Sequence, residues 1–203
     1  LWRKNRERVP ASWSIALSDF SPGMATEAQQ RLKAIDITAT SHVCDAQALP
    51  FPDRSFDAVI ANHMLYHVPN LDRALGEFAR VLKNSGTLYS ATNGYRHLAE
   101  IDALMSAAKP GTYWRSRDKL GFSLDEGETD LSKHFGEVIR HDFPDEFRVT
   151  QTAPLLQYIE SSVPLANDFK TALQKLIESQ IQERGHVYIG KHAGLFISHQ
   201  PKL

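Results

Sequence analysis

Short apolar runs alternate with amphipathic stretches along the first half of the chain. Four of these runs are predicted strands: 14–19, 38–43, 57–62 and 87–91. Residues 21–35 form a predicted helix, because Ser21-Pro22 supplies a cap and a proline for its first turn. Residues 69–83 form another, since apolar side chains recur there every three or four positions, and Gly86 is predicted to end it. Strands that alternate with helices are typical of a mostly parallel sheet with helices on both faces.

The second half of the chain has a different pattern. Residues 97–135 mix helix-like pieces with glycine, proline and acidic turns, which indicates an insertion and not a second domain. Residues 137–143 and 187–198 are predicted strands, and we expect them to form an antiparallel hairpin at the edge of the sheet. Apolar positions at helical spacing over residues 169–181 predict a further helix. The pattern therefore predicts one Rossmann-like, doubly wound α/β domain over residues 1–203.

Composition narrows the class of protein. The 23 cationic and 24 anionic side chains nearly balance, so a general attraction to nucleic acid or to anionic membranes is not expected, and a small-molecule partner is favoured. An apolar run of about 18 residues is not present, so we expect no membrane span. Cys44 is the single cysteine, which excludes an intrachain disulfide and a cysteine zinc cluster and suits a reducing compartment such as the cytoplasm.

Asp19 is the first candidate for binding chemistry. It ends the predicted strand 14–19, and in a doubly wound sheet ligands bind outside the carboxyl ends of the strands. Its carboxylate can accept hydrogen bonds from both hydroxyls of a ribose. A second interpretation is that Asp19 caps the helix that follows, and the two interpretations are compatible.

Asp45 and Ala46 follow the next predicted strand. The Asp45 carboxylate can accept a hydrogen bond from an adenine amino group, and the Ala46 amide can donate to a ring nitrogen. The alternative is that Asp45 caps a turn. In the string Leu49-Pro50-Phe51-Pro52-Asp53-Arg54-Ser55-Phe56-Asp57 that comes next, the apolar residues are predicted core positions and Pro52-Asp53 a turn.

Asn62 and His63 leave the predicted strand 57–62, where polar groups can approach the reactive part of a bound cofactor. His63 is the candidate general base, and a histidine held by a local hydrogen bond is the open alternative. His67 would share a helix face with His63, but a third ligand is not evident, so we expect no metal. Phe20 and Met24 are predicted either to flank the adenine or to lie in the core.

These residues, in this order, resemble a class I S-adenosylmethionine-dependent methyltransferase of the type 11 group. The resemblance implies S-adenosylmethionine as cofactor, with Asp19 on the ribose and Asp45 with Ala46 on the adenine. It also implies that residues 1–96 bind the cofactor. We expect the insertions at 97–135 and 151–185 to form a substrate lid, in which Tyr113, Trp114, Arg115 and Arg117 line an entrance or pack.

The sequence departs from the group in one respect. In the group a glycine-rich loop follows a first strand, whereas here residues 1–9 look like a helix end stopped by Pro10, and the loop motif is not present. We expect residues upstream of the sequence, or another chain, to supply that strand between the strands 14–19 and 57–62. The chain by itself is then expected to bind the cofactor weakly.

The predicted function is methyl transfer to a small-molecule acceptor. The alternative from another class is a catalytically silent module that keeps the fold for binding or interaction. A nicotinamide-dependent oxidoreductase is disfavoured, because its fingerprint does not include Asp45 and the string 49–57. The sequence permits a homodimer.

Overall fold

The computed structural model describes residues 2–114 and 121–202, so Arg115 and Arg117 lie outside the described residues. The strands in this part of the chain are β1 (Ala16–Asp19), β2 (Thr40–Val43), β3 (Phe56–Asn62), β4 (Leu82–Asn93), β5 (Phe135–Val149) and β6 (Val187–Pro201). The α-helices are α1 (Pro22–Lys33), α2 (Leu71–Val81), α3 (Ala99–Ala108), α4 (Gly127–His134), α5 (Thr152–Glu160) and α6 (Asn167–Arg184). Two 3-10 helices complete the order, η1 (Trp2–Arg8) and η2 (Leu65–His67).

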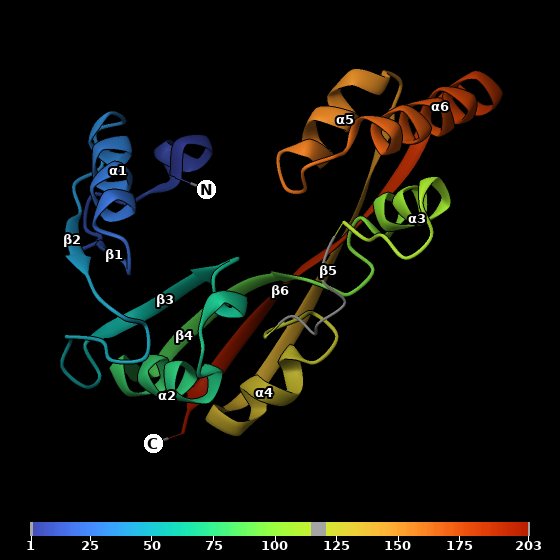
Figure 1. The fold of residues 1–203 in the computed structure, drawn as a ribbon. Coiled ribbons are helices and arrows are strands. Elements are labelled where there is room, and N and C mark those ends of the chain that lie inside the picture. Colours follow the sequence, from blue (N-terminus) through green and yellow to red (C-terminus); the bar gives the residue numbers. More distant parts are fainter. Residues whose placement is uncertain (1, 115–120, 203) are drawn as a thin grey trace.

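The strands form two sheets. β1 pairs with β2 in parallel, and the other sheet has the order β3-β4-β6-β5. In that sheet β3 and β4 are parallel, whereas β6 is antiparallel to both of its neighbours. The predicted antiparallel hairpin is therefore confirmed, with β5 at the outer edge. In Figure 1, β1, β2 and α1 lie together on one side, and α3, α5 and α6 gather around the far ends of β5 and β6.

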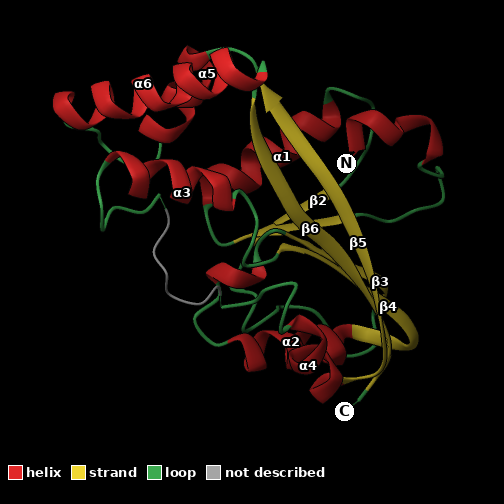
Figure 2. Ribbon diagram, turned by 90° about the vertical axis from the view of Figure 1, so that its right-hand side faces the viewer, coloured by secondary structure: helices red, strands yellow, loops and turns green. Residues whose placement is uncertain are grey.

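Helices cover both faces of the four-stranded sheet. α2 and α4 lie side by side in both views (Figures 1 and 2), and they pack with Leu88 and Phe196 in one apolar cluster. α3, α5 and α6 form a second cluster with Val187 and Ile189 of β6. Side chains alternate between the two faces of a strand, and β6 pairs with β5 without a register shift. Val187 and Ile189 therefore face one side of the sheet, and Phe196 faces the other. The doubly wound α/β class is thereby confirmed.

Most predicted elements are found within a few residues of the predicted bounds. Ser21 caps α1, where its Oγ accepts a hydrogen bond from the Met24 amide at 3.4 Å, and Pro22 opens the helix. In α6 the predicted apolar face is real, because Phe169, Leu173 and Ile177 are all buried. These elements were predictable because each follows from local spacing and capping.

One prediction about a helix end was wrong, and another is confirmed only in part. α2 ends at Val81 because Leu82 already has an extended backbone (φ −75°, ψ 139°) and pairs with Phe56 of β3. Gly86 lies instead in an irregular part of the β3–β4 pairing, where a Cβ atom would come within 2.9 Å of the Lys83 carbonyl oxygen. The segment predicted as a helix end at 1–9 is a 3-10 helix with a kink at Asn5.

A break in strand pairing separates β1 from β3. Within the described residues β1 pairs with β2 alone and β3 with β4 alone, so no hydrogen bonds join the two sheets. The break falls where the resemblance to the methyltransferase group puts one further strand. Near it, on the second sheet, a row of apolar side chains crosses from β3 to β5, and its outer members Ile60 and Ile139 are 44% and 40% exposed.

Candidate active site

Asp19 and Asp45 lie at the same edge of the small sheet. β1 and β2 are parallel, with Asp19 opposite Val43 at their carboxyl ends. The backbone then continues the pairing, because the Cys44 amide donates to the Asp19 carbonyl oxygen at 3.1 Å. The structure therefore places at one edge the two acidic residues that sequence analysis selected from separate strands.

The Asp19 carboxylate has a structural role in the turn before α1. Its Oδ1 accepts a hydrogen bond from the Ser21 amide at 2.8 Å, and Ser21 itself caps the helix. The capping interpretation of Asp19 is thus corrected in detail, since the N-cap is Ser21 and Asp19 orders the residues before it. A carboxylate has about four acceptor positions, so this one bond leaves capacity for a ligand hydroxyl.

Asp45 closes a turn through Gln47. Its Oδ1 accepts from the Gln47 amide at 2.8 Å, and the Gln47 side-chain nitrogen lies 3.0 Å from both carboxylate oxygens. These bonds, the backbone one first, hold the pKa of Asp45 below its ordinary value. The turn-capping interpretation is therefore observed. A ligand amino group at Asp45 would have to share or displace the Gln47 side chain.

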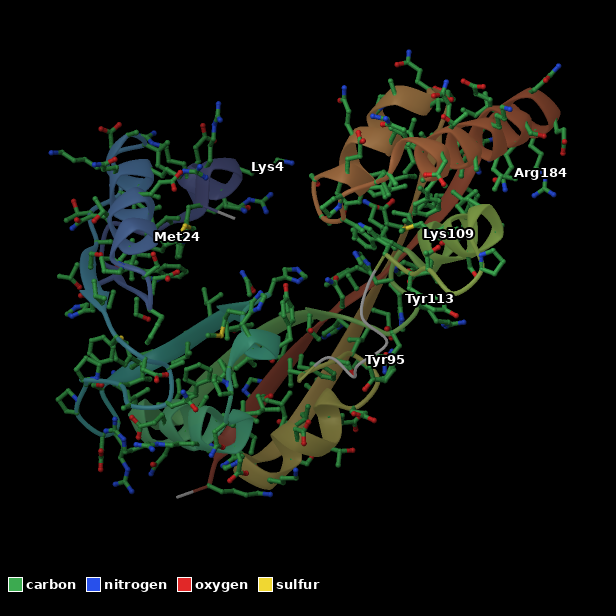
Figure 3. All side chains as sticks on the ribbon, in the orientation of Figure 1. Lys4, Met24, Tyr95, Lys109, Tyr113 and Arg184 are labelled. Atoms are coloured by element: carbon green, nitrogen blue, oxygen red, sulfur yellow. The ribbon has the colours of Figure 1, made fainter. Side chains whose placement is uncertain are left out.

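Phe20 and Met24 do not belong to the core. Their exposed fractions are 79% and 54%, so the core interpretation of both residues was wrong. Met24 lies on α1, in the part of the molecule that also contains β1 and β2 (Figure 3). Ala46 is partly buried against the apolar cluster that contains α2 and α4. Two exposed apolar side chains next to Asp19 are available to a flat ring.

Asn62 and His63 leave β3 in the other sheet. Both are exposed, and the His63 amide donates to the Ala91 carbonyl oxygen of β4 at 2.8 Å. His63 has φ 52°, in the left-handed region, so the chain turns sharply at the strand end. His67 ends the 3-10 helix η2, and His63 precedes that helix, so the expectation of a shared helix face was wrong. No described residues form a group of three possible metal ligands.

Arg80 holds the string after Asp45 in place, which sequence analysis did not predict. It donates five hydrogen bonds, two to Glu77, one to Asp53, and one each to the carbonyl oxygens of Leu49 and Phe51. Glu77 also accepts from the Leu49 amide at 2.7 Å. We call Arg80 and Glu77 the α2 clamp. The only local signal is their spacing of three on one helix face, which is common on helix surfaces and points to no partner.

Acid is expected to weaken the α2 clamp. Hydrogen bonding by Arg80, with help from the Leu49 amide, holds the pKa of Glu77 below its ordinary value of 4.5. The stabilisation is then fully present above about pH 4.5 and is lost as the pH falls through the lower pKa of the folded state. Urea unfolding of the wild type and Glu77→Gln should show a difference in unfolding free energy at neutral pH that shrinks in acid. An equal difference at both pH values would contradict this role.

A cavity of about 530 Å³ in the described part of the chain is distant from these side chains. It lies between α3, α6 and the start of β6, with Glu100 and Arg184 among its polar residues. Figure 3 shows Arg184 at the end of the molecule opposite Met24. In the described part of the chain, every helix is too short or too polar to cross a bilayer.

Comparison with known proteins gives one family match. The sequence profile of the family described as "Methyltransferase domain" matches residues 5–90. A curated relative, the ubiquinone/menaquinone biosynthesis C-methyltransferase UbiE of Xanthomonas campestris, is 40% identical over 83 residues, which is 40% of this chain and 33% of the relative. The chain thus spans about a third of the length of the curated relatives it matches.

Solved structures share the fold over nearly the whole chain. A putative methyltransferase from Bacillus halodurans has a TM-score of 0.61 and 16% identity, covering 94% of this chain and 84% of that one. A phosphoethanolamine N-methyltransferase of Haemonchus contortus, solved with S-adenosylhomocysteine, has a TM-score of 0.53 and 18% identity, covering 98% of this chain and 46% of that one. At such identities the similarity concerns the fold alone.

Proposed function

We propose that the protein transfers the methyl group of S-adenosylmethionine to a small-molecule acceptor, because residues 5–90 match the methyltransferase domain family and the chain shares the fold of a solved putative methyltransferase. The observation that carries the proposal is the pair of carboxylates, Asp19 and Asp45, at the carboxyl ends of adjacent parallel strands. A silent binding module is not favoured, because this edge keeps polar groups where a nucleoside would need them.

The roles follow from the order of residues along this edge. Asp19 would accept hydrogen bonds from the ribose hydroxyls, while its Oδ1 also accepts from the Ser21 amide. Asp45 and Ala46 would bind the adenine edge, and Phe20 and Met24 would cover its faces. Asn62 and His63 would approach the methionine part of the cofactor from β3.

The sulfonium group carries the reactive methyl and has a good leaving group, so the chain's main task is to orient the acceptor and to exclude water. A base is needed where the nucleophile must lose a proton, and His63 is the candidate on β3. Helices α3, α5 and α6 would form the lid over the acceptor. A cytoplasmic location and a homodimer remain part of this proposal.

Titration calorimetry with S-adenosylhomocysteine tests the proposal. Two forms are compared, the 203-residue chain and the product of the gene read from its own start codon. We expect binding to the second form and weaker binding to the first, because β1 and β3 are not joined in one sheet. Failure of both forms to bind would reject the cofactor assignment and favour the silent module.

A further inference from the structure

His192 lies where β6 runs past the carboxyl end of β4. Its carbonyl oxygen accepts a hydrogen bond from the Gly94 amide at 2.8 Å, directly beyond the pairing of Asn93 with Ala193. The ring is half-buried, and Nδ1 is its enclosed atom, without a hydrogen-bond partner among the described residues. A buried, unpaired ring nitrogen is costly, so its surroundings call for an explanation.

Gly94 creates the space that the ring occupies. A Cβ atom on Gly94 would lie 2.1 Å from His192 Nδ1 and 2.9 Å from Asp125 Oδ2. The imidazole and the carboxylate therefore both border the space that a side chain at position 94 would fill. The Tyr95 amide donates to the same Asp125 oxygen at 2.7 Å, which holds the carboxylate at that place.

His97 fixes the backbone beside the ring. Its Nδ1 accepts a hydrogen bond from the His192 amide at 3.1 Å, and the Leu98 amide donates to the Gly190 carbonyl oxygen at 2.9 Å. The segment between β4 and α3 is thus tied to the start of β6 at two points. These contacts hold the backbone of His192 in place.

Other charges around His192 are paired with one another. Asp142 of β5 binds Arg140, and this interaction, with a smaller contribution from His192, holds the pKa of Asp142 below its ordinary value. Lys191 of β6 pairs with Asp145, which is also on β5. Asp125 is therefore the carboxylate that borders the same space as His192 Nδ1.

We propose that His192, positioned by Asp125, is the general base for an acceptor that presents a weakly acidic hydroxyl, such as a phenol or an enol. The proposal rests on the proposed function. With its proton on Nδ1 facing Asp125, the ring presents Nε2 as the proton acceptor, as in other histidine–carboxylate pairs. A neutral hydroxyl suits this site because the nearby cations, Arg140 and Lys191, are already paired with carboxylates.

The chemical step balances without another reactant. The acceptor hydroxyl gives its proton to His192 Nε2 as its oxygen bonds to the methyl carbon. The bond from that carbon to sulfur breaks, and its electron pair leaves the sulfonium as a neutral thioether. His192 then releases the proton to water.

His192 and His63 flank the end of β4. Neighbouring strands are about 5 Å apart, so the backbones of β3 and β6 are separated by about 10 Å across β4. The Asp125 carboxylate borders the space beside His192 Nδ1, so the arrangement of groups favours His192 as the base.

Nitrogen NMR of histidine-labelled protein tests the pair directly. The His192 signal is assigned by its loss in His192→Gln, and we expect the tautomer with hydrogen on Nδ1. Asp125→Asn should reduce the share of that tautomer, since Nδ1 loses the neighbouring carboxylate. His141→Gln is the matched control on β5, and should leave the His192 tautomer unchanged. The opposite tautomer, or a tautomer share that Asp125→Asn does not change, would overturn the assignment.

The acceptor class is tested with 4-nitrophenol, whose anion is coloured. Protein saturated with S-adenosylhomocysteine should raise the anion fraction of the probe at a pH below the probe's own pKa, and His192→Gln should abolish the change without loss of S-adenosylhomocysteine affinity. Asp125→Asn should reduce it, and His141→Gln should not. Absence of ionisation by wild type, or equal ionisation by His192→Gln, would overturn the inference alone. Failure to bind S-adenosylhomocysteine would instead reject the proposed function.

Discussion

Replacing Arg80 by alanine is expected to lower the free energy of unfolding by about 3 kcal/mol and to release the segment 49–53 from α2. The side chain is 28% exposed, and two of its five hydrogen bonds go to Glu77 on the same helix. The other three connect the helix to the segment 49–53, at the Asp53 carboxylate and two carbonyl oxygens. Its removal leaves Glu77, which is 19% exposed, without its cation. Because the segment 49–53 follows Asp45 directly, cofactor affinity should fall as well.

Urea unfolding measures the effect of Arg80→Ala. Arg31→Ala is the matched control, since Arg31 also pairs with a glutamate on its own helix but is 78% exposed, and its removal should change stability little. Arg80→Lys should recover only part of the loss, because an ammonium group cannot reproduce the branched set of bonds. Equal stability of Arg80→Ala and Arg31→Ala would show that the α2 clamp does not support the fold.

Asp19→Asn is expected to lower the affinity for S-adenosylhomocysteine by about 10- to 100-fold with little change in stability. Asparagine keeps an oxygen that can accept from the Ser21 amide, so the turn before α1 is preserved. It loses the negative charge and the second acceptor that a ribose diol requires. Calorimetry measures the affinity, in the form of the protein that binds the ligand, and thermal unfolding measures the stability.

Ser21→Ala separates the two roles of this turn. It removes the side-chain cap of α1 and should cost about 1 kcal/mol of stability, while the Asp19 carboxylate stays in place. The two variants should therefore give opposite patterns. If Asp19→Asn binds as tightly as wild type, the ribose assignment fails and Asp19 is a turn residue alone.

Sequence analysis predicted much of the fold because its signals are local. The apolar face of α6 and the cap of α1 each depend on residues a few positions apart, and both are found in the structure. The end of α2 was mispredicted because a contact distant in sequence decides it. Leu82 is drawn into pairing with Phe56, so the helix stops before the glycine that would otherwise end it.

The sequence likewise predicted some features of the candidate site and not others. Asp19, Asp45 and His63 could be selected from the sequence because each follows a predicted strand, and strand ends meet at one edge of a parallel sheet. The sequence could not show that the Gln47 side chain donates hydrogen bonds to both oxygens of the Asp45 carboxylate, because these bonds depend on the shape of one turn.

The sequence by itself determined the alternation of strands and helices, the antiparallel hairpin and the strand-end residues of the cofactor edge. Periodicity and capping act over a few residues, so they can be read before the chain folds. Only the tertiary structure decided that Arg80 holds the segment after Asp45 and that His192 meets Asp125 beside Gly94. Those contacts join residues far apart in the chain, and their geometry arises when the strands pair and the helices pack.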